Sequence, residues 1–178
     1  TGIMHSSVPV DAQHQDTYFV VAHFHYVLIG GALFGLFSGF YYWLPKITGR
    51  MMSEKLGKFV FTLMFLGFNL TFFPMHYLGM IGQPRRTHSY NEGHGFETWN
   101  QIATIGSFIL GVGVFIGVLQ FIHSAFSKKL KPAGKNPWDG RTLEWTLSSP
   151  PKEYNFARTP IINSRDQAWE NNYGPREN

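Results

Sequence analysis

The chain has 178 residues and no cysteine, which excludes disulfides, cysteine-ligated zinc and cysteine-ligated iron–sulfur clusters. A net charge of +4 and a pI of about 9.4 could suggest nucleic-acid binding, but the basic residues lie beside long apolar runs, as in membrane proteins. The mean hydropathy of −0.11 averages residues 1–127, which are apolar in long blocks, and residues 128–178, which are polar and hold six of the ten prolines. We therefore expect contact with a lipid bilayer and no nucleic acid.

Residues 1–16 are predicted to form a polar segment at the outer membrane face, because they show no apolar stripe of helical period. Asp16 and Thr17 are suited to cap a following helix, since a carboxylate or hydroxyl accepts hydrogen bonds from the first free amides. The chain starts at Thr1 without a methionine or a recognisable signal peptide, so we expect it to be part of a longer polypeptide.

The first apolar run extends from Thr17 to Pro45 without a charged residue. It exceeds the roughly 20 residues that a membrane helix needs, and a chain in lipid must satisfy its own backbone as a helix. We predict a span over about 17–45 that ends at Pro45. Gly31, Gly35 and Gly39 would form a smooth groove on one face, for a neighbouring helix in the more common case or otherwise for a flat cofactor.

Two histidines, His23 and His25, lie inside this run with Phe24 between them. Residues two apart on a helix are separated by about 200°, so the two imidazoles point to nearly opposite faces and cannot share one metal ion. Each histidine alone could be a hydrogen-bonded polar residue inside a bundle. Intramembrane ionisable residues are functional candidates, however, and imidazole is a common heme-iron ligand. The spacing favours one helix placed between two cofactors.

A second span is predicted over about 59–82, with a bend at Pro74. His76 follows this proline, and we interpret it as satisfying loosened backbone groups rather than as a ligand. The loop 46–58 is basic and is predicted to be cytoplasmic by the positive-inside rule.

A third span is predicted over about 101–126, preceded by a polar outer loop at 83–97. Four lysines follow this span within residues 128–135, which places the C-terminus inside and the N-terminus outside. Residues 17–127 thus form a three-helix transmembrane region, and residues 128–178 form an irregular cytoplasmic tail. The fold class is an all-α membrane protein.

Several motifs lie along this framework, namely Asp16-Thr-Tyr-Phe-Val-Val-Ala-His-Phe-His-Tyr-Val27, Phe73-Pro-Met-His-Tyr-Leu-Gly79, Gln83-Pro-Arg-Arg86, Thr142-Leu-Glu-Trp145 and Ser149-Pro-Pro151. Together they resemble the C-terminal quarter to third of subunit I of heme-copper terminal oxidases. The resemblance covers essentially the whole chain. It implies that the three spans are the last three helices of a twelve-helix bundle.

The resemblance implies a role for each matching residue. His23 matches the proximal, catalytic ligand to the iron of the oxygen-binding high-spin heme, and His25 matches an axial ligand to the iron of the low-spin heme. Phe24 would lie near the heme edges. Arg85 and Arg86 match an arginine pair that binds heme propionates, which suits guanidinium groups because they pair bidentately with carboxylates.

Two carboxylates of the outer segment also match family positions. Asp11 matches a carboxylate near a propionate of the oxygen-binding heme, and Asp16 matches a ligand of a magnesium or manganese site shared with subunit II. The family has a histidine directly before that aspartate, whereas this chain has Gln15 there and His14 one place earlier. Glutamine is a poor ligand beside a carboxylate for a hard cation, which argues against bound magnesium.

The implied function is that of a proton-pumping cytochrome c oxidase of the bacterial cell (inner) membrane, which reduces dioxygen to water. The resemblance implies two hemes of the heme A type, copper in the same complex but not ligated by this chain, and cytochrome c as electron donor. The implied protein partners are the remaining helices of subunit I and subunits II and III, so the chain alone would not be active. The alternatives are a quinol-oxidising relative and a non-catalytic membrane subunit that binds heme.

Overall fold

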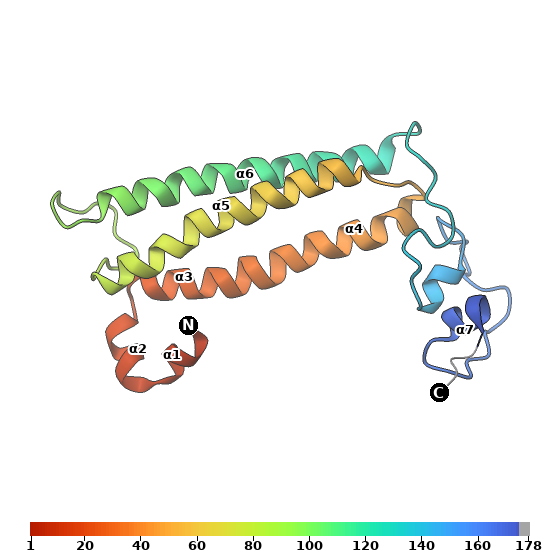
Figure 1. The fold of residues 1–178 in the computed structure, drawn as a ribbon, viewed down its shortest axis with the longest axis horizontal. Helices are drawn as coiled ribbons and strands as arrows, with labels where there is room; N and C mark the ends of the chain where they lie inside the picture. The colour runs from red at the N-terminus through yellow and green to blue at the C-terminus, as the bar shows by residue number, and fades with distance from the viewer. Residues whose placement is uncertain (175–178) are drawn as a thin grey trace. The chain divides into compact units, whose positions relative to one another are not determined.

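The computed structural model describes residues 1–174, and all of its named elements are helices (Figure 1). These are α1 (Gly2–Ser6), α2 (Val8–His14), α3 (Tyr18–Val27), a π-helical segment (Leu28–Leu33), α4 (Phe34–Thr48), α5 (Glu54–Met80), α6 (Glu97–Phe126), a 3-10 turn (Leu143–Thr146) and α7 (Gln167–Tyr173). The chain divides into two compact units. One comprises Thr1–Leu36 with Glu54–Val118, and the other comprises Phe37–Ser53 with the residues from Leu119 onward.

Three helical stretches are long and apolar enough to cross a membrane, which confirms the predicted all-α membrane fold. They are Tyr18–Thr48, formed by α3, the π-helical segment and α4, then Glu54–Met80 and Glu97–Phe126. The second and third helices begin four or five residues before the predicted apolar spans. Glu54 and Glu97 lie in their first turns, where a negative charge interacts favourably with the helix dipole.

The first helix continues past Pro45 to Thr48, so the prediction that it ends at the proline is wrong. Proline removes one backbone donor, but the next turn keeps its other hydrogen bonds. The Gly49 amide donates to the Pro45 carbonyl at 2.9 Å, and the Thr48 hydroxyl donates to the Leu44 carbonyl at 2.9 Å. Gly49, with a φ of 73°, then ends the helix in the left-handed conformation that glycine adopts readily.

The outer segment also differs from the prediction, because residues 1–16 contain two short helices, α1 and α2. Pro9 lies in the first turn of α2, where a helix tolerates proline because the first amides have no helical partner. The sequence predicts no helix here because residues 1–16 lack an apolar stripe. Neither helix contains a buried residue, so neither needs such a stripe.

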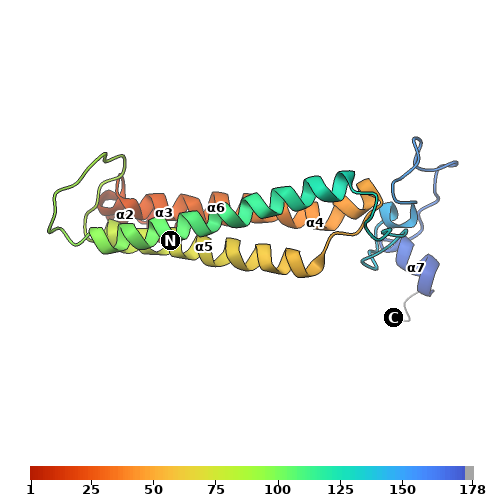
Figure 2. The same ribbon diagram turned by 90° about the horizontal axis from the view of Figure 1, so that it is seen from above.

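In the first unit, α3, α5 and α6 run side by side (Figures 1 and 2). They pack through glycines at which the backbones approach closely. Gly79 of α5 lies against the backbone of Phe19 in α3, and Gly67 of α5 lies against Leu110 in α6. A β-carbon at either glycine would overlap the facing backbone. Gly106 of α6 likewise lies against the backbone of Thr71 in α5, so glycines on both helices determine how near α5 and α6 come.

The predicted glycine groove on the first helix is not used for helix packing within the described residues. A β-carbon added at Gly31 or Gly35 would meet nothing within 4 Å, and at Gly39 it would meet only Trp43 of the same helix. The common use of such a groove, close packing against a neighbouring helix, is therefore absent from residues 1–174.

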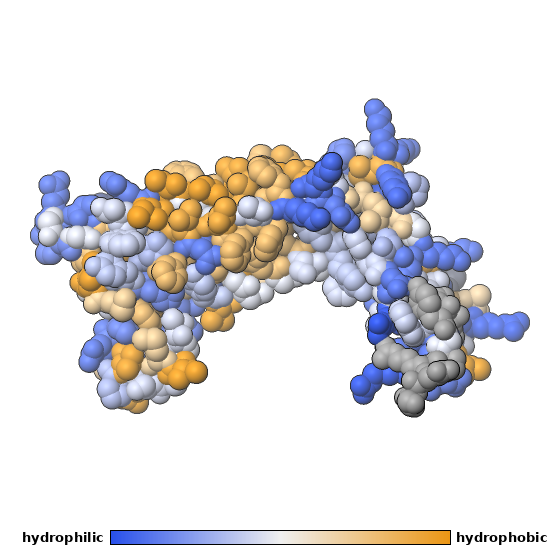
Figure 3. Space-filling view, in the orientation of Figure 1, coloured by the Kyte–Doolittle hydropathy of each residue, from blue (hydrophilic) through white to orange (hydrophobic). Residues whose placement is uncertain are grey.

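Apolar side chains also cover the outside of this unit, as Figure 3 shows by the hydrophobic surface over the middle of α5 and α6. Phe61 on α5 is 56% exposed and Phe108 on α6 is 72% exposed. Large exposed apolar surfaces on soluble proteins are uncommon, whereas lipid covers such surfaces in membrane proteins.

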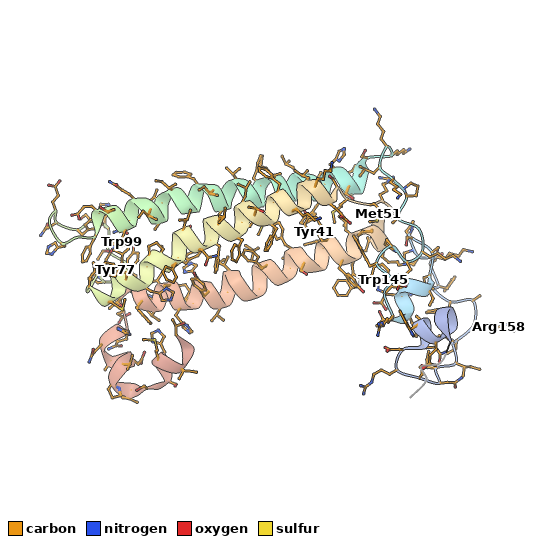
Figure 4. The ribbon with its side chains drawn as sticks, viewed as in Figure 1. Tyr41, Met51, Tyr77, Trp99, Trp145 and Arg158 are labelled. Atoms are coloured by element: carbon orange, nitrogen blue, oxygen red, sulfur yellow. The ribbon has the colours of Figure 1, made fainter. Side chains whose placement is uncertain are left out.

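In the second unit, the predicted tail packs on the end of α4, where Figure 4 labels Trp145. Lys46 is 5% exposed, and its ammonium group donates to the carbonyls of Lys135 at 2.7 Å and Leu147 at 2.8 Å. The Trp138 indole donates to the Tyr42 carbonyl at 2.9 Å. The tail is mostly irregular, with one 3-10 turn and α7, and residues 175–178 of the predicted tail lie outside the described residues.

Candidate functional site

Thr17 fixes the start of α3 and with it the position of both histidines. The Phe19 amide donates to the Thr17 hydroxyl oxygen at 3.1 Å, and this hydroxyl donates to the His14 carbonyl at 2.6 Å. The predicted cap is thus confirmed for Thr17. Asp16 precedes it with a φ of 54° and does not make the capping bond.

The His25 imidazole is held by its own helix and by α5. Its Nδ1 lies 2.8 Å from the Val21 carbonyl oxygen. Because a carbonyl only accepts hydrogen bonds, Nδ1 carries the hydrogen and Nε2 of the neutral ring keeps its lone pair. The ring stacks on Phe72 of α5 with centroids 4.2 Å apart and an interplanar angle of 12°. The arrangement suits a metal ion at Nε2, since metal-binding histidines usually donate their other ring N–H to a fixed acceptor.

The His23 imidazole contacts Thr1 and α1. The Thr1 hydroxyl lies 2.7 Å from its Nδ1, and the His5 ring lies 4.9 Å away between centroids. The two histidines therefore contact different elements, which confirms the prediction that they leave α3 on different faces. Nδ1 is engaged by Thr1, so a metal ion would bind at Nε2, in the tautomer whose Nδ1 donates to the Thr1 hydroxyl oxygen.

Arg85 lies on the His25 side of the site. Its guanidinium carbon is 5.9 Å from the centroid of the Phe24 ring, and Phe24 lies 4.5 Å from the His25 ring. Two backbone hydrogen bonds hold this loop against the start of α3, from Tyr18 N–H to the Gln83 carbonyl at 2.9 Å and from Arg85 N–H to the Asp16 carbonyl at 2.8 Å.

The Arg85 side chain has an unused donor. Its Nε is buried without a hydrogen-bond partner, and the nearest Asp16 carboxylate oxygen is 4.0 Å away, too far for a hydrogen bond. A buried, unpaired guanidinium N–H fits an anionic group such as a carboxylate. Arg86 follows with a φ of 62° and is exposed.

Asp11 and Asp16 lie in different surroundings. An Asp11 carboxylate oxygen is 3.2 Å from His5 Nδ1, which places Asp11 on the His23 side, whereas Asp16 faces Arg85. Within residues 1–174 no three His, Cys, Asp or Glu side chains are arranged to hold a metal ion. His14 stacks on Phe19, with the ring centroids 4.2 Å apart.

His76 stays close to the backbone near Pro74. Its Nδ1 lies 3.3 Å from the Phe73 carbonyl oxygen, and its ring meets Phe19 edge to face at 5.1 Å. Its Nε2 is buried without a partner. The contact with the Phe73 carbonyl agrees with the interpretation of His76 as a residue that satisfies the backbone.

Sequence reasoning missed the α5 residues that face the histidine pair. Phe72 stacks on His25, and Asn69 accepts a hydrogen bond from the Tyr26 hydroxyl at 2.8 Å. An asparagine inside an otherwise apolar span is a signal that could have identified Asn69. Nothing in the sequence distinguishes Phe72 from the other phenylalanines, of which the chain has 17 in total.

Comparison with known proteins identifies the family. The model of the family described as cytochrome c and quinol oxidase polypeptide I matches residues 1–109, a segment that includes His23, His25, Arg85 and Arg86. The chain belongs to this family. The match covers more than half of the chain and both sides of the histidine site.

Individual members of the oxidase polypeptide I family are also similar to the chain. It is 48% identical to cytochrome c oxidase subunit 1 of Bacillus subtilis over 170 residues, which are 95% of this chain and 27% of that protein. It is 48% identical to the Synechocystis protein of the same name over 91% of this chain and 29% of that protein. Quinol oxidase subunit 1 of B. subtilis is 42% identical over 93% of this chain and 26% of that protein. The chain thus spans about a quarter of the length of these relatives.

Proposed function

We propose that this chain is part of subunit I of a proton-pumping terminal oxidase, which reduces dioxygen to water with electrons from cytochrome c. In this proposal His23 and His25 each supply one axial ligand to a different heme iron. The observation that carries it is the pair of imidazoles on α3, which contact different elements and are each held through Nδ1. The chain alone would not be active, because the other ligands of such a centre must come from elsewhere.

The residues around α3 fit two hemes. When bound, the hemes would supply electron transfer at the His25 side and oxygen binding at the His23 side. The Val21 carbonyl fixes the tautomer of His25 by accepting a hydrogen bond from Nδ1. Phe24 separates the two histidines in the sequence, and its ring contacts the His25 ring. Arg85 has a buried, unpaired N–H that could bind a heme propionate. We propose that Arg86 also binds a heme propionate.

The outer segment and the loops would complete the environment. We place Asp11 near a propionate of the oxygen-binding heme. We place Asp16 at a magnesium or manganese site with ligands from subunit II. Gln15, which stands where the family has a histidine ligand, would weaken metal binding at that site. The proposed partners are the other helices of subunit I, subunits II and III, copper held outside this chain, and cytochrome c. The hemes would be of the heme A type.

Oxidation of a quinol is the second candidate, because a quinol oxidase subunit is among the similar proteins. The higher identity to cytochrome c oxidase subunits and the residues Asp16-Thr-Tyr18 and His25-Tyr26 favour cytochrome c. The purified complex should consume oxygen with reduced cytochrome c and not with a quinol alone. The reverse preference would assign the quinol-oxidising function.

The test of the heme assignment replaces each histidine in the full complex. His25→Ala should remove the low-spin heme band from the reduced-minus-oxidised spectrum, and His23→Ala should remove the carbon monoxide-reactive band. His123→Ala is the matched control, since this histidine also lies in an apolar helix but is exposed and far along α6.

Loss of the same band in both variants would contradict the assignment to opposite faces. A complex in which neither variant changes any heme band would instead support a subunit that does not ligate heme through α3.

A further inference from the structure

The α5 face that meets His25 presents a flat aromatic ring. Phe72 is 7% exposed, and its ring lies nearly parallel to the imidazole, at 12°, with a centroid distance of 4.2 Å. The ring is supported from behind by Phe68, one turn earlier on α5, at 5.5 Å and an angle of 58°. Phe72 therefore cannot turn easily within the packed interior.

The two contacts of the imidazole restrict different motions. The hydrogen bond from Nδ1 to the Val21 carbonyl at 2.8 Å fixes which nitrogen is protonated and where that nitrogen points. It leaves the ring free to tilt about the line of the bond. The parallel face of Phe72 opposes that tilt, because a tilted imidazole would overlap the phenyl ring.

A neighbouring hydrogen bond holds α3 and α5 in this register. The Tyr26 hydroxyl donates to the Asn69 side-chain oxygen at 2.8 Å, and the Asn69 amide donates to the Phe65 carbonyl of its own helix at 2.8 Å. Tyr26 directly follows His25, so rotation of α3 that separated His25 from Phe72 would also break this bond. Interhelical hydrogen bonds of this kind help to hold packed membrane helices in register.

We propose that Phe72 is a positioning residue, which sets the plane of the His25 imidazole and through it the ligand field at the iron that His25 would bind. The inference rests on the proposed role of His25 as a heme ligand. Groups that orient a metal-binding histidine alter the properties of the metal without touching it. The orientation of an axial imidazole plane determines the splitting of the iron orbitals, which the spectrum of a low-spin ferric heme reports.

The experiment is electron paramagnetic resonance of the oxidised full complex with Phe72→Met. Methionine has a similar volume but no flat face, so it keeps the packing and removes the restraint on tilt. We expect the low-field line of the low-spin heme to shift and broaden, while heme content and the carbon monoxide-reactive heme stay unchanged. The separate variant Phe72→Tyr keeps a flat ring, so its low-field line should stay at the position seen in the unmodified protein.

Phe96→Met is the matched control, because Phe96 is also 7% exposed but contacts Tyr90 and His94 rather than His25 or Phe72. The proposal is overturned if the line of Phe72→Met is unshifted, or if Phe96→Met shifts it equally. Phe72→Leu serves as a second variant should the methionine variant not assemble, with the same expected shift. Retention of the low-spin signal in His25→Ala would instead refute the proposed function, so the two failures can be told apart.

Discussion

The Thr17 hydroxyl caps the start of α3, the helix that carries both histidines. That hydroxyl accepts from the Phe19 amide and donates to the His14 carbonyl, so it connects α3 to the end of α2. A side-chain oxygen at this position satisfies one of the amides that have no helical partner. Since α3 holds both imidazoles, the first turn of this helix also helps to position them.

Replacement of Thr17 by alanine should loosen that first turn. Loss of an N-cap costs about 1 kcal/mol, which corresponds to about a fivefold increase in local opening. Hydrogen exchange of the full complex, followed by mass spectrometry, should show faster exchange of the Phe19 amide in Thr17→Ala. Thr17→Ser keeps the hydroxyl and should exchange as the unmodified protein does. Equal exchange in the alanine and serine variants would mean that the cap contributes little.

Features that follow from local geometry could be predicted at single residues, and features that depend on tertiary packing could not. The opposite faces of His23 and His25 follow from the angle between residues two apart, and the Thr17 cap follows from its place before an apolar run. The contacts of the imidazoles with Phe72 and Thr1 depend on how distant segments meet. The ligand roles of both histidines stay predictions.

Among the elements, α5 is the helix against which the first unit packs. It meets α3 at Gly79 and α6 at Gly67, in both places by close approach of backbones. The sequence places glycines in all three apolar runs, so it does not distinguish those that lie at an interface from those that lie open. The groove expected at Gly31 and Gly35 is open, whereas Gly67, inside the second run, is buried.

Gly67→Leu should destabilise the packing of α5 on α6. A side chain there would overlap the backbone of Leu110, and overpacking of an interior costs about 1–3 kcal/mol or more. The midpoint of thermal denaturation of the purified complex should fall.

Gly111→Leu is the matched control, because this glycine lies on α6 in open space and receives the same leucine. It should leave the midpoint near that of the unmodified protein. A fall of equal size in both variants would indicate that the cost comes from leucine in any of these helices and not from the contact at Gly67.

Irregular turns within the helices were the features least accessible from the sequence. The apolar runs predicted three helices, but not the π-helical segment Leu28–Leu33 or the turn beyond Pro45. A π-helical segment accommodates an extra residue without breaking the helix, so apolar composition alone does not reveal it. The sequence predicts an end at Pro45 because proline removes a donor, but the following turn is held by hydrogen bonds that do not need that donor.

For the molecule as a whole, the distribution of charge along the chain gives the strongest argument about the membrane. Apolar helices alternate with a basic loop at 46–58, a polar loop at 83–97 and a lysine-rich stretch at 128–135. Positive residues concentrate on the cytoplasmic side of membrane proteins, so we propose that the first and third of these segments are inside and the second is outside. The N-terminus would then lie outside and the C-terminus inside.

The absence of cysteine from the chain permits a direct test of this orientation. Single replacements of serine by cysteine change one atom and create one site within residues 1–178 for a thiol reagent that cannot cross the membrane. In intact cells that contain the full complex, Ser89→Cys should be labelled on this chain from the outside. Ser53→Cys should be labelled only after the cells are opened, because it lies in the basic loop.

A third replacement, Ser107→Cys, controls for access through the membrane itself. Ser107 lies inside the third apolar helix, about three turns from its start, and is exposed on the isolated chain, so only lipid or other protein would shield it. It should remain unlabelled in both intact and opened cells. Labelling of Ser53→Cys from outside together with protection of Ser89→Cys would reverse the orientation. Labelling of Ser107→Cys in intact cells would show that the third helix does not cross the membrane, which would also contradict the proposed three-span arrangement.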